Sequence, residues 1–305
     1  VEFSKEQLEA LHALNHKFSL ITGGPGTGKS FITQAMSYIE HDAGKRVLIV
    51  APTGKAAIRL KNDYVESMTI HKALKIFDEI PGHDKNNKLL YDTVFIDESS
   101  MINVILLRQL LEAIPSDSKI IMIGDKNQLP PIGYGTPFSD LIKYGLESGR
   151  YPVYELIQNH RTDKDSLDIN RAAQLVMNGD QKSLIQLSKI SDSFRIFYLP
   201  KDELIEQNAI RIFEEAYKYS INNGSKFFND FVKHTMVLVA ANQTRRVINS
   251  SICKDLLDHS PYQLFPGLRI INLANDYNKN VFNGEMGFVD YIDAEGAFIE
   301  FDGRA

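Results

Sequence analysis

The 305-residue sequence lacks several features that would assign it to a special class of protein. Its single cysteine, Cys253, cannot form an internal disulfide, and we expect it to pack as a small residue in a helix. No signal peptide is visible, which together with the single cysteine favours the reducing cytoplasm. No apolar run approaches the roughly 20 residues that span a bilayer, which argues against a membrane protein. The absence of low-complexity tracts and short repeats excludes fibrous and solenoid folds.

The charge balance of the chain limits how it could bind nucleic acid. A net charge of −5 and a pI near 5.9 argue against a surface that attracts nucleic acid everywhere, so any such site must be local. Hydrophobic residues make up 43% and charged residues 24%, as in folded globular proteins. The length favours two domains of roughly 150 residues each.

The first part of the chain has the pattern of an α/β domain. Short apolar runs alternate with longer helical segments, which is typical of a parallel sheet covered by helices. We expect strands at residues 18–22, 47–51, 93–96 and 119–123. Ligands of such sheets bind outside the carboxyl ends of the strands. The functional residues should therefore follow these four segments.

The second part of the chain is less regular. The polar residues 78–92 predict a loop or small hairpin, and a helix at 166–177 should end near Gly179. A domain boundary near 180–193 then precedes a second alternation. Its expected elements are a strand at 194–198, a helix at 201–221, a strand at 236–240 and a helix at 243–257. From Leu268 onward, turn sequences such as Asn283-Gly284 and Glu295-Gly296 predict a small β module.

A phosphate-loop motif of the form G-x-x-x-x-G-K-[ST] follows the first predicted strand directly and opens a helix. Its residues are Gly23, Gly24, Pro25, Gly26, Thr27, Gly28, Lys29 and Ser30. The glycines let backbone N–H groups turn toward a polyphosphate, and the helix N-terminus adds a favourable dipole. Lys29 can reach the β and γ phosphates, and Ser30 offers a ligand to Mg²⁺. We therefore predict a nucleoside triphosphate site.

Polar residues after two further strands predict hydrolysis of that nucleotide. Asp97 ends an apolar strand and can hold Mg²⁺, while the adjacent Glu98 can orient and deprotonate the attacking water. Gln128 follows the next strand and can sense the γ-phosphate by hydrogen bonding to it or to the water. An Asp-Glu pair or a glutamine in isolation is an ordinary polar loop, and its position after a buried strand favours the functional interpretation.

This set of motifs resembles superfamily 1 DNA helicases, most closely the RecD-like branch that includes the exodeoxyribonuclease V alpha subunit. The resemblance runs over nearly the whole chain. The matching segments are Gln7, GGPGTGKS at 23–30, APTGKAA at 51–57, TIHKAL at 69–74, IDESSM at 96–101, GDKNQLPP at 124–131, NHR at 159–161 and residues 275–287. It implies tandem RecA-like α/β domains of the P-loop NTPase fold. The first motor domain would occupy residues 1–180, the start of the second 194–265, and a partial β-barrel-like insertion 266–305.

The resemblance also implies roles for two residues outside the phosphate loop. Gln7 would recognise the adenine edge and so favour ATP. Arg161 would be an arginine finger that stabilises charge on the γ-phosphate, although a surface salt bridge is an alternative for it. Family members often carry glutamine after this arginine, whereas this chain has Thr162, so any role of that glutamine is in doubt.

The path of single-stranded DNA is likewise implied by the resemblance. Pro52, Thr53, Lys55 and His71 would grip the strand across the first domain. Hydroxyls, amides and a few cations can hold a phosphodiester backbone without reading sequence. Asn242 would add a contact from the second domain, but an ordinary amphipathic helix explains its segment equally well. Residues 283–285 would lead into the β insertion, or form a simple hairpin turn.

The expected partners are single-stranded DNA and other subunits of a helicase–nuclease complex, with ATP and Mg²⁺ as cofactors and no membrane. Movement would run 5′ to 3′ by resemblance, in recombination or repair. Two further family motifs have no match before Ala305, so we expect a fragment that binds ATP and unwinds DNA poorly. The alternatives are an RNA helicase of the same superfamily and a nucleotide-switched scaffold; a metabolic kinase would have no use for GDKNQLPP.

Overall fold

The computed structural model describes most of the chain. The described residues are 3–76, 80–160, 164–196, 205–222, 236–256, 258–260, 262–273, 276, 279, 281 and 285–301. Two compact units can be distinguished, of which the first comprises Val1–Leu167 with Asn272–Glu285. The second comprises Asp168–Ile271 with Met286–Ala305. Each unit is described by itself.

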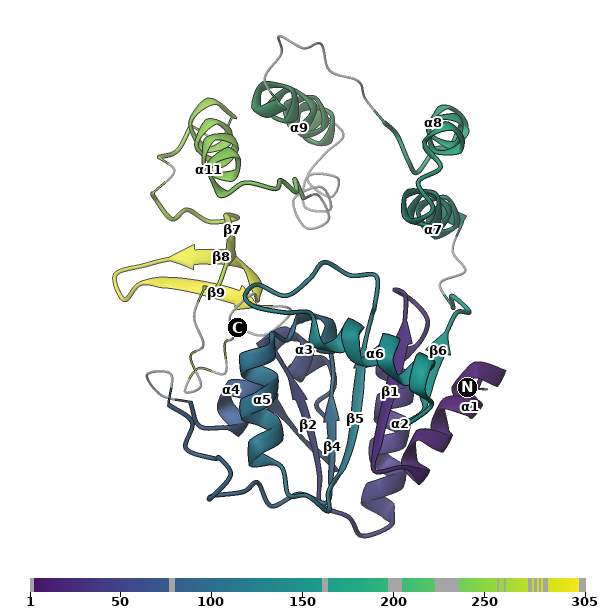
Figure 1. Cartoon of the computed structure of the whole chain (residues 1–305). Helices are drawn as coiled ribbons and strands as arrows, with labels where there is room; N and C mark the ends of the chain where they lie inside the picture. Colours follow the sequence, from purple (N-terminus) through teal and green to yellow (C-terminus); the bar gives the residue numbers. More distant parts are fainter. Residues whose placement is uncertain are drawn as a thin grey trace. The chain divides into compact units, whose positions relative to one another are not determined.

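The first unit is built around a six-stranded parallel sheet in the order β3-β2-β4-β5-β1-β6 (Figure 1). The strands are β1 (Phe18–Gly23), β2 (Val47–Ala51), β3 (Glu66–Thr69), β4 (Thr93–Ile96), β5 (Lys119–Gly124) and β6 (Val153–Leu156). Because β5 lies between β1 and β4, the segments that follow these three strands leave the sheet side by side. This topology decides which functional residues can meet.

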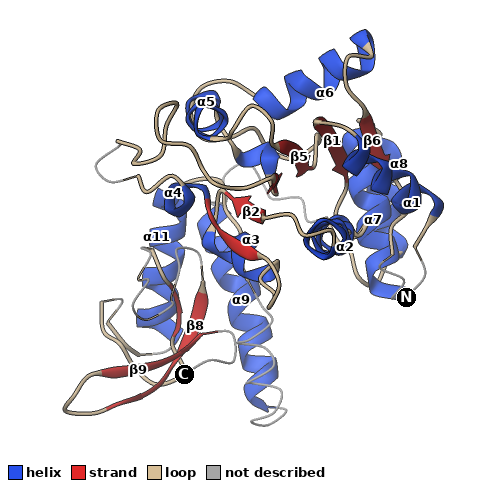
Figure 2. Ribbon diagram, turned by 90° about the horizontal axis from the view of Figure 1, so that it is seen from below, coloured by secondary structure: helices blue, strands red, loops and turns tan. Residues whose placement is uncertain are grey.

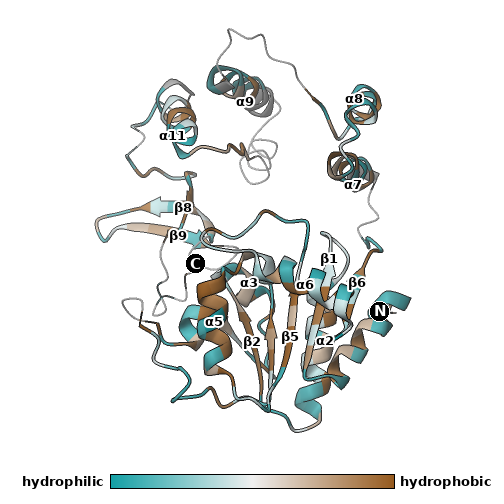
Figure 3. Ribbon diagram, viewed as in Figure 1, coloured by the Kyte–Doolittle hydropathy of each residue, from teal (hydrophilic) through white to brown (hydrophobic). Residues whose placement is uncertain are grey.

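Helices cover both faces of the sheet, as Figure 2 shows from below. They are α1 (Lys5–Ala10), α2 (Lys29–Asp42), α3 (Gly54–Arg59), α4 (Ile70–Ala73), α5 (Val104–Ala113) and α6 (Pro137–Ser148), with 3₁₀ turns at Leu11–Asn15 and Ser99–Met101. Consecutive residues of one strand enter two different cores: Leu20 packs with α5 and α6, and Ile21 packs with α2. Strands buried on both faces have no polar alternation, which explains their unbroken apolar runs (Figure 3).

The four strands predicted in this unit are confirmed, and two more strands exist. The additional strands, β3 and β6, are the two edges of the sheet. Each carries exposed positions, such as Glu66 and Glu155, so neither shows the continuous apolar run of a central strand. The polar segment predicted as a loop or hairpin has no strand within its described residues 80–92, although Ile80 forms an isolated β-bridge.

The second unit contains helices and a small antiparallel sheet. The helices are α7 (Lys164–Met177), which begins in the first unit, α8 (Gln181–Ile190), α9 (Ile205–Asn222) and α11 (Asn242–Ser251), which continues into a π-helical turn at Ile252–Leu256. The sheet has the order β7-β8-β9, with β7 at Arg269–Ile271, β8 at Met286–Ile292 and β9 at Ala297–Phe301. The predicted turn at Glu295-Gly296 joins β8 to β9, with Gly296 at φ 144°. Asn283 and Gly284 lie outside the described residues.

One strand predicted in the second unit is wrong. Residues 236–240 are irregular, and Leu238 is 84% exposed. A strand needs a partner for its backbone groups, and the apolar run alone supplies none. The first three residues of the strand predicted at 194–198 are irregular too, and the last two lie outside the described residues. The second RecA-like domain therefore stays a prediction. No helix among the described residues is both long enough and apolar enough to cross a membrane.

Candidate nucleotide site

The phosphate loop connects the end of β1 to the start of α2. Gly26 and Gly28 have φ angles of 80° and 84°, in the left-handed region that glycine adopts without strain. The Thr27 hydroxyl donates to the Gly24 carbonyl at 2.9 Å, which closes the loop on itself. A Cβ on Gly28 would lie 2.4 Å from Nε2 of Gln7, so the loop fits closely against the N-terminal helix. The predicted motif therefore forms a compact, tightly bounded loop.

Lys29 folds back over this loop. Its Nζ donates to the Gly23 carbonyl at 2.7 Å and to the Gly24 carbonyl at 2.9 Å. Burial lowers the pKa of Lys29, while the nearby carboxylates of Asp125, Glu98 and Asp97 act in the opposite direction. A cation and three carboxylates thus share one small region at the ends of β1, β4 and β5.

Asp97 and Glu98 directly follow β4. Asp97 is 1% exposed, and burial, followed by the charge of Glu98, raises its pKa. Glu98 has a φ of 49°, a conformation that costs a residue with a side chain about 1–2 kcal/mol and marks strain held by its surroundings. Asp97 Oδ1 and Glu98 Oε2 are buried and have no hydrogen-bond partner. Two such carboxylate oxygens are suited to receive a cation.

Arg59 contacts both of these carboxylates. Its Nη2 lies 3.1 Å from Asp97 Oδ2 and 3.0 Å from Glu98 Oε1. Arg59 is the last residue of α3, which starts beyond the end of β2, the strand next to β4. The sequence-based assignment missed this residue because no motif names it. The one available signal was its place on the segment that follows a strand neighbouring the Asp-Glu strand.

The residues present fit a magnesium ion that is shared with a nucleotide. Among the described residues, no group of three or more His, Cys, Asp and Glu could hold a metal. Mg²⁺ in nucleotide sites commonly takes one or two protein oxygens and completes its shell with phosphates and water. The unpartnered Oδ1 of Asp97 meets that requirement, and Ser30, in the first turn of α2, offers a hydroxyl.

Gln7, Asn159 and His160 pack against the phosphate loop. Gln7 is 3% exposed; its Oε1 accepts from the Ser4 backbone N–H at 3.0 Å, and its Nε2 donates to the Thr27 carbonyl at 3.3 Å. Nε2 of Gln7 also lies 3.2 Å from Nε2 of His160. The structure thus brings together two predicted motifs that are 153 positions apart.

The first two residues of the predicted NHR motif contact the loop backbone. The Asn159 side chain donates to the Pro25 carbonyl at 3.0 Å, and the His160 N–H donates to the Gly26 carbonyl at 2.9 Å. These contacts were not predicted from the sequence. Arg161 and Thr162 lie outside the described residues.

Gln128 lies beside the segment that carries the two carboxylates. Its Oε1 accepts from the Ser100 hydroxyl at 3.2 Å, and Ser100 is two residues beyond Glu98. The Lys126 N–H donates to the Thr22 hydroxyl at 3.1 Å, which ties the loop after β5 to β1. The Gln128 side chain is exposed and can therefore contact a ligand.

The predicted DNA-binding residues of the first unit lie on two short helices. Pro52 and Thr53 precede α3, Lys55 lies within it, and His71 lies in α4. Lys55 and His71 are exposed. The Thr53 hydroxyl accepts from the Ala56 N–H at 3.3 Å, so it caps α3 as well. Asn242 is an exposed first residue of α11 in the second unit.

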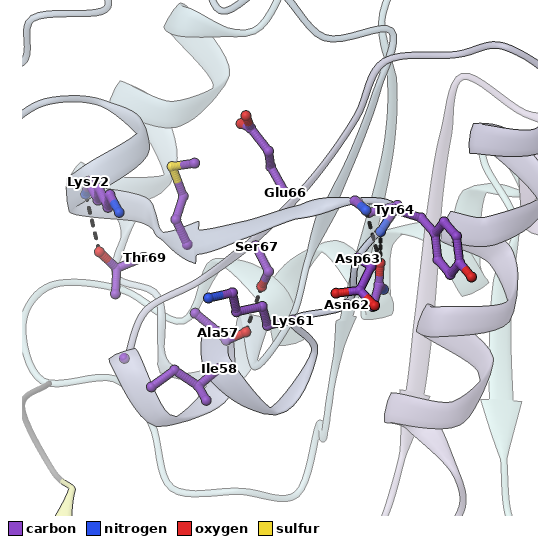
Figure 4. Close-up of a pocket in the computed structure, with 13 residues that line it drawn as sticks. Ala57, Ile58, Lys61, Asn62, Asp63, Tyr64, Glu66, Ser67, Thr69 and Lys72 are labelled. Carbon is purple, nitrogen blue, oxygen red and sulfur yellow. Dashed lines mark hydrogen bonds between the residues drawn. The ribbon is translucent and has the colours of Figure 1, made fainter. Parts of the chain in front are cut away.

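A cavity of about 420 Å³ lies between α3 and the edge strand β3 (Figure 4). Lys61 and Ser67 line it, together with Thr69 and Lys72 at the start of α4. The Ser67 hydroxyl donates to the Ala57 carbonyl at 2.6 Å, and the Thr69 hydroxyl accepts from the Lys72 N–H at 3.2 Å. The cavity contains no phosphate-loop residue, so it is a separate hollow next to the predicted DNA-binding segment.

Comparison with known proteins was made at the level of sequence and of structure. Residues 7–134 match the family model described as an AAA domain. The ATP-dependent RecD2 DNA helicase of Deinococcus radiodurans is 29% identical over 311 aligned positions, which cover 99% of this chain and 40% of that protein. The RecBCD enzyme subunit RecD of Mycolicibacterium smegmatis is 24% identical over 323 positions, which cover 94% and 57%. The chain thus spans about half the length of these curated relatives.

Two solved structures have the same architecture. The crystal structure of Pif1 helicase from Bacteroides in complex with ADP-AlF3 and ssDNA aligns with a TM-score of 0.57 at 17% identity and covers 100% of this chain and 73% of that one. A structure of two coordinating Pif1 helicases at forked dsDNA gives 0.55 at 19%, with coverages of 100% and 75%. At these identities the likeness concerns the fold, and it confirms the predicted α/β P-loop NTPase fold.

Proposed function

We propose, from the similarity of this chain to RecD2 and RecD helicases, that it is an ATP-hydrolysing motor that moves along single-stranded DNA. The observation that supports this most is the convergence of Lys29, the Asp97-Glu98 pair and Gln128 at the ends of three neighbouring strands. We further propose 5′ to 3′ movement in recombination or repair, in the cytoplasm.

The proposed hydrolysis uses groups that the fold brings together at the phosphate loop. Lys29 exchanges the Gly23 and Gly24 carbonyls for the β and γ phosphates, so the loop opens onto its ligand. Ser30 and Asp97 would hold Mg²⁺, which offsets phosphate charge when bound. Glu98 orients the attacking water and accepts its proton.

Three further residues complete the proposed ATP site. Gln7 lies against the phosphate loop, to which it is joined through the Thr27 carbonyl, and its amide would exchange its present partners for the adenine edge. Gln128 would report the presence of the γ-phosphate to the Asp97–Ser100 segment through Ser100. Arg161 would stabilise charge on the transferred phosphoryl group.

The proposed DNA path crosses α3 and α4 of the first unit. Pro52, Thr53, Lys55 and His71 would contact the sugar-phosphate backbone, and the exposure of Lys55 and His71 supports this assignment. Asn242 would make a further contact from α11. The relatives named as RecBCD subunits support other subunits of a helicase–nuclease complex as partners.

The test is ATP hydrolysis by wild type and by Lys29→Ala, each without polymer, with single-stranded DNA and with RNA of the same length. We expect DNA to stimulate the wild-type rate and Lys29→Ala to reduce that rate about 10²- to 10³-fold. Lys45→Ala is the matched control. Lys45 is exposed just before β2, at the end of the strand opposite the nucleotide site, and its loss should leave the rate unchanged. A Lys29→Ala rate equal to wild type would contradict the ATPase, and stimulation by RNA alone would favour an RNA motor.

A further inference from the structure

Arg59 occupies a position at which a cation joins two carboxylates. One nitrogen, Nη2, bridges Asp97 Oδ2 and Glu98 Oε1, and the other oxygen of each carboxylate is buried without a partner. We propose that Arg59 is a positioning residue that substitutes for magnesium in the nucleotide-free protein and is displaced when magnesium and nucleotide bind. This inference rests on the proposed function, because it assigns a residue to the same ATP site.

The contacts of Glu98 give the first argument. While its Oε1 is paired with the guanidinium, this oxygen is engaged with Arg59 rather than with an attacking water. The same arginine also contacts Asp97, the proposed magnesium ligand. Arg59 therefore holds both carboxylates in place and keeps Glu98 engaged until the metal is present.

The surroundings of Arg59 give the second argument. Its side chain is 49% exposed, whereas those of Asp97 and Glu98 are 1% and 17% exposed, so the arginine is the partner that can leave. A divalent cation on Asp97 would lie within a few ångströms of the guanidinium, and Lys29 is a further positive charge nearby. Like charges at that distance repel in a partly buried site. Binding of the metal thus favours release of Arg59.

The helix that carries Arg59 gives the inference a consequence for DNA. α3 is a six-residue helix that begins after Thr53, contains Lys55 and ends at Arg59. The proposed DNA contacts and the proposed magnesium substitute are therefore on one short rigid element. Release of Arg59 removes the ion pairs that join the end of α3 to the carboxylates after β4, so the hold on DNA should depend on the bound nucleotide through this residue.

The first experiment measures binding rather than activity. A fluorescent ADP is titrated into wild type, Arg59→Gln and Arg59→Lys at a series of Mg²⁺ concentrations and in EDTA. Removing a competing cation should lower the Mg²⁺ concentration for half-maximal binding about three- to tenfold in Arg59→Gln. Arg59→Lys should stay near wild type, because it keeps the charge. Binding in EDTA should change little in either variant.

The second experiment tests the coupling to DNA. The affinity for a fluorescent single-stranded oligonucleotide is measured with and without magnesium and ADP. We expect wild type to bind DNA differently in the two conditions, and Arg59→Gln to lose most of that difference. Arg46→Gln is the matched control: Arg46 also pairs with an aspartate, Asp92, but it precedes β2 and is remote from the nucleotide site. It should behave as wild type.

The outcomes separate the inference from the function on which it rests. If wild type binds no nucleotide, the proposed ATP site is wrong. If wild type binds magnesium and ADP, and Arg59→Gln needs an equal or higher Mg²⁺ concentration, the magnesium-substitute role is overturned while the ATP site stands. A circular dichroism melt of Arg59→Gln close to that of wild type excludes misfolding, and Arg59→Met, which removes the charge but keeps an unbranched side chain, provides the same test if the glutamine variant is unfolded.

Discussion

Gly28 shows how closely the nucleotide site depends on single residues. Its backbone is left-handed, and Nε2 of Gln7 lies 2.4 Å from the position that a Cβ would occupy. The two constraints act on one residue that is both the N-cap of α2 and the neighbour of Lys29. Any side chain here must therefore strain the backbone and displace a buried amide at the same time.

We predict that Gly28→Ala weakens nucleotide binding by about tenfold or more, because the added Cβ displaces Gln7 and changes the shape of the phosphate loop. Gly44→Ala is the control for destabilisation by left-handed strain alone, since Gly44 has a φ of 76°, open space around it and a place beyond the end of α2. Isothermal titration with ADP should show a loss for Gly28→Ala alone. Equal binding by the two variants would contradict the role given to the close approach of Gln7 to Gly28.

Site residues that belong to a short sequence motif could be predicted from the sequence. Lys29 and the Asp97-Glu98 pair follow predicted strands within a few positions, so their meeting could be expected from the topology of a parallel sheet. Arg59 could not be found this way, nor could the contact of His160 with Gln7, because these contacts join positions 38 and 153 apart and depend on side-chain conformation. Strand order, which the sequence does not show, brings them to the site.

At the scale of elements, one buried carboxylate ties α2 to two central strands. Glu40 Oε1 accepts from Lys119 at 2.6 Å, and its Oε2 accepts from the Thr93 hydroxyl at 2.5 Å. Glu40 lies in the last turns of α2, Thr93 begins β4 and Lys119 begins β5. This link fixes the end of α2 that is opposite the phosphate loop, and so orients the helix whose first turn carries Ser30.

We predict that Glu40→Ala lowers the free energy of unfolding by about 3 kcal/mol, because it leaves Lys119 and the Thr93 hydroxyl without their partner in a largely buried place. Glu9→Ala is the control, since Glu9 pairs only with Lys5 at the exposed surface of α1 and should cost less than about 0.5 kcal/mol. Urea unfolding measures both. A Glu40→Ala cost as small as that of Glu9→Ala would show that the link is not stabilising.

The same scale shows where hydrophobic patterns are sufficient and where they are not. Residues 47–51 and 93–96 were predicted with their observed bounds, because strands buried on both faces have no competing pattern. The edge strand at 66–69 has only one buried residue, Thr69, and was missed. The apolar run at 236–240 was assigned a strand that is absent, because pairing depends on a neighbour rather than on the run itself.

At the scale of the whole molecule, the negative net charge opposes the binding of DNA. With 34 basic and 39 acidic side chains, the mean field of the protein repels a polyanion. Affinity for DNA must then come from a few local cations rather than from the surface as a whole. Such binding depends on salt in proportion to the number of phosphates that these cations neutralise.

The salt dependence of DNA affinity can be predicted for the proposed DNA path. The logarithm of the affinity for single-stranded DNA should fall with the logarithm of salt concentration by a slope of about 0.7 for each phosphate that a cation of the path neutralises. Lys55→Ala should reduce that slope by about 0.7, because Lys55 is exposed on α3. Lys45 precedes β2, whereas the proposed path follows that strand. Lys45→Ala therefore changes the net charge by the same amount but leaves the residues of the path in place. Fluorescence anisotropy over a salt series measures all three slopes. If the two variants lose the same amount, net charge rather than a local contact governs binding, and the path over α3 is wrong.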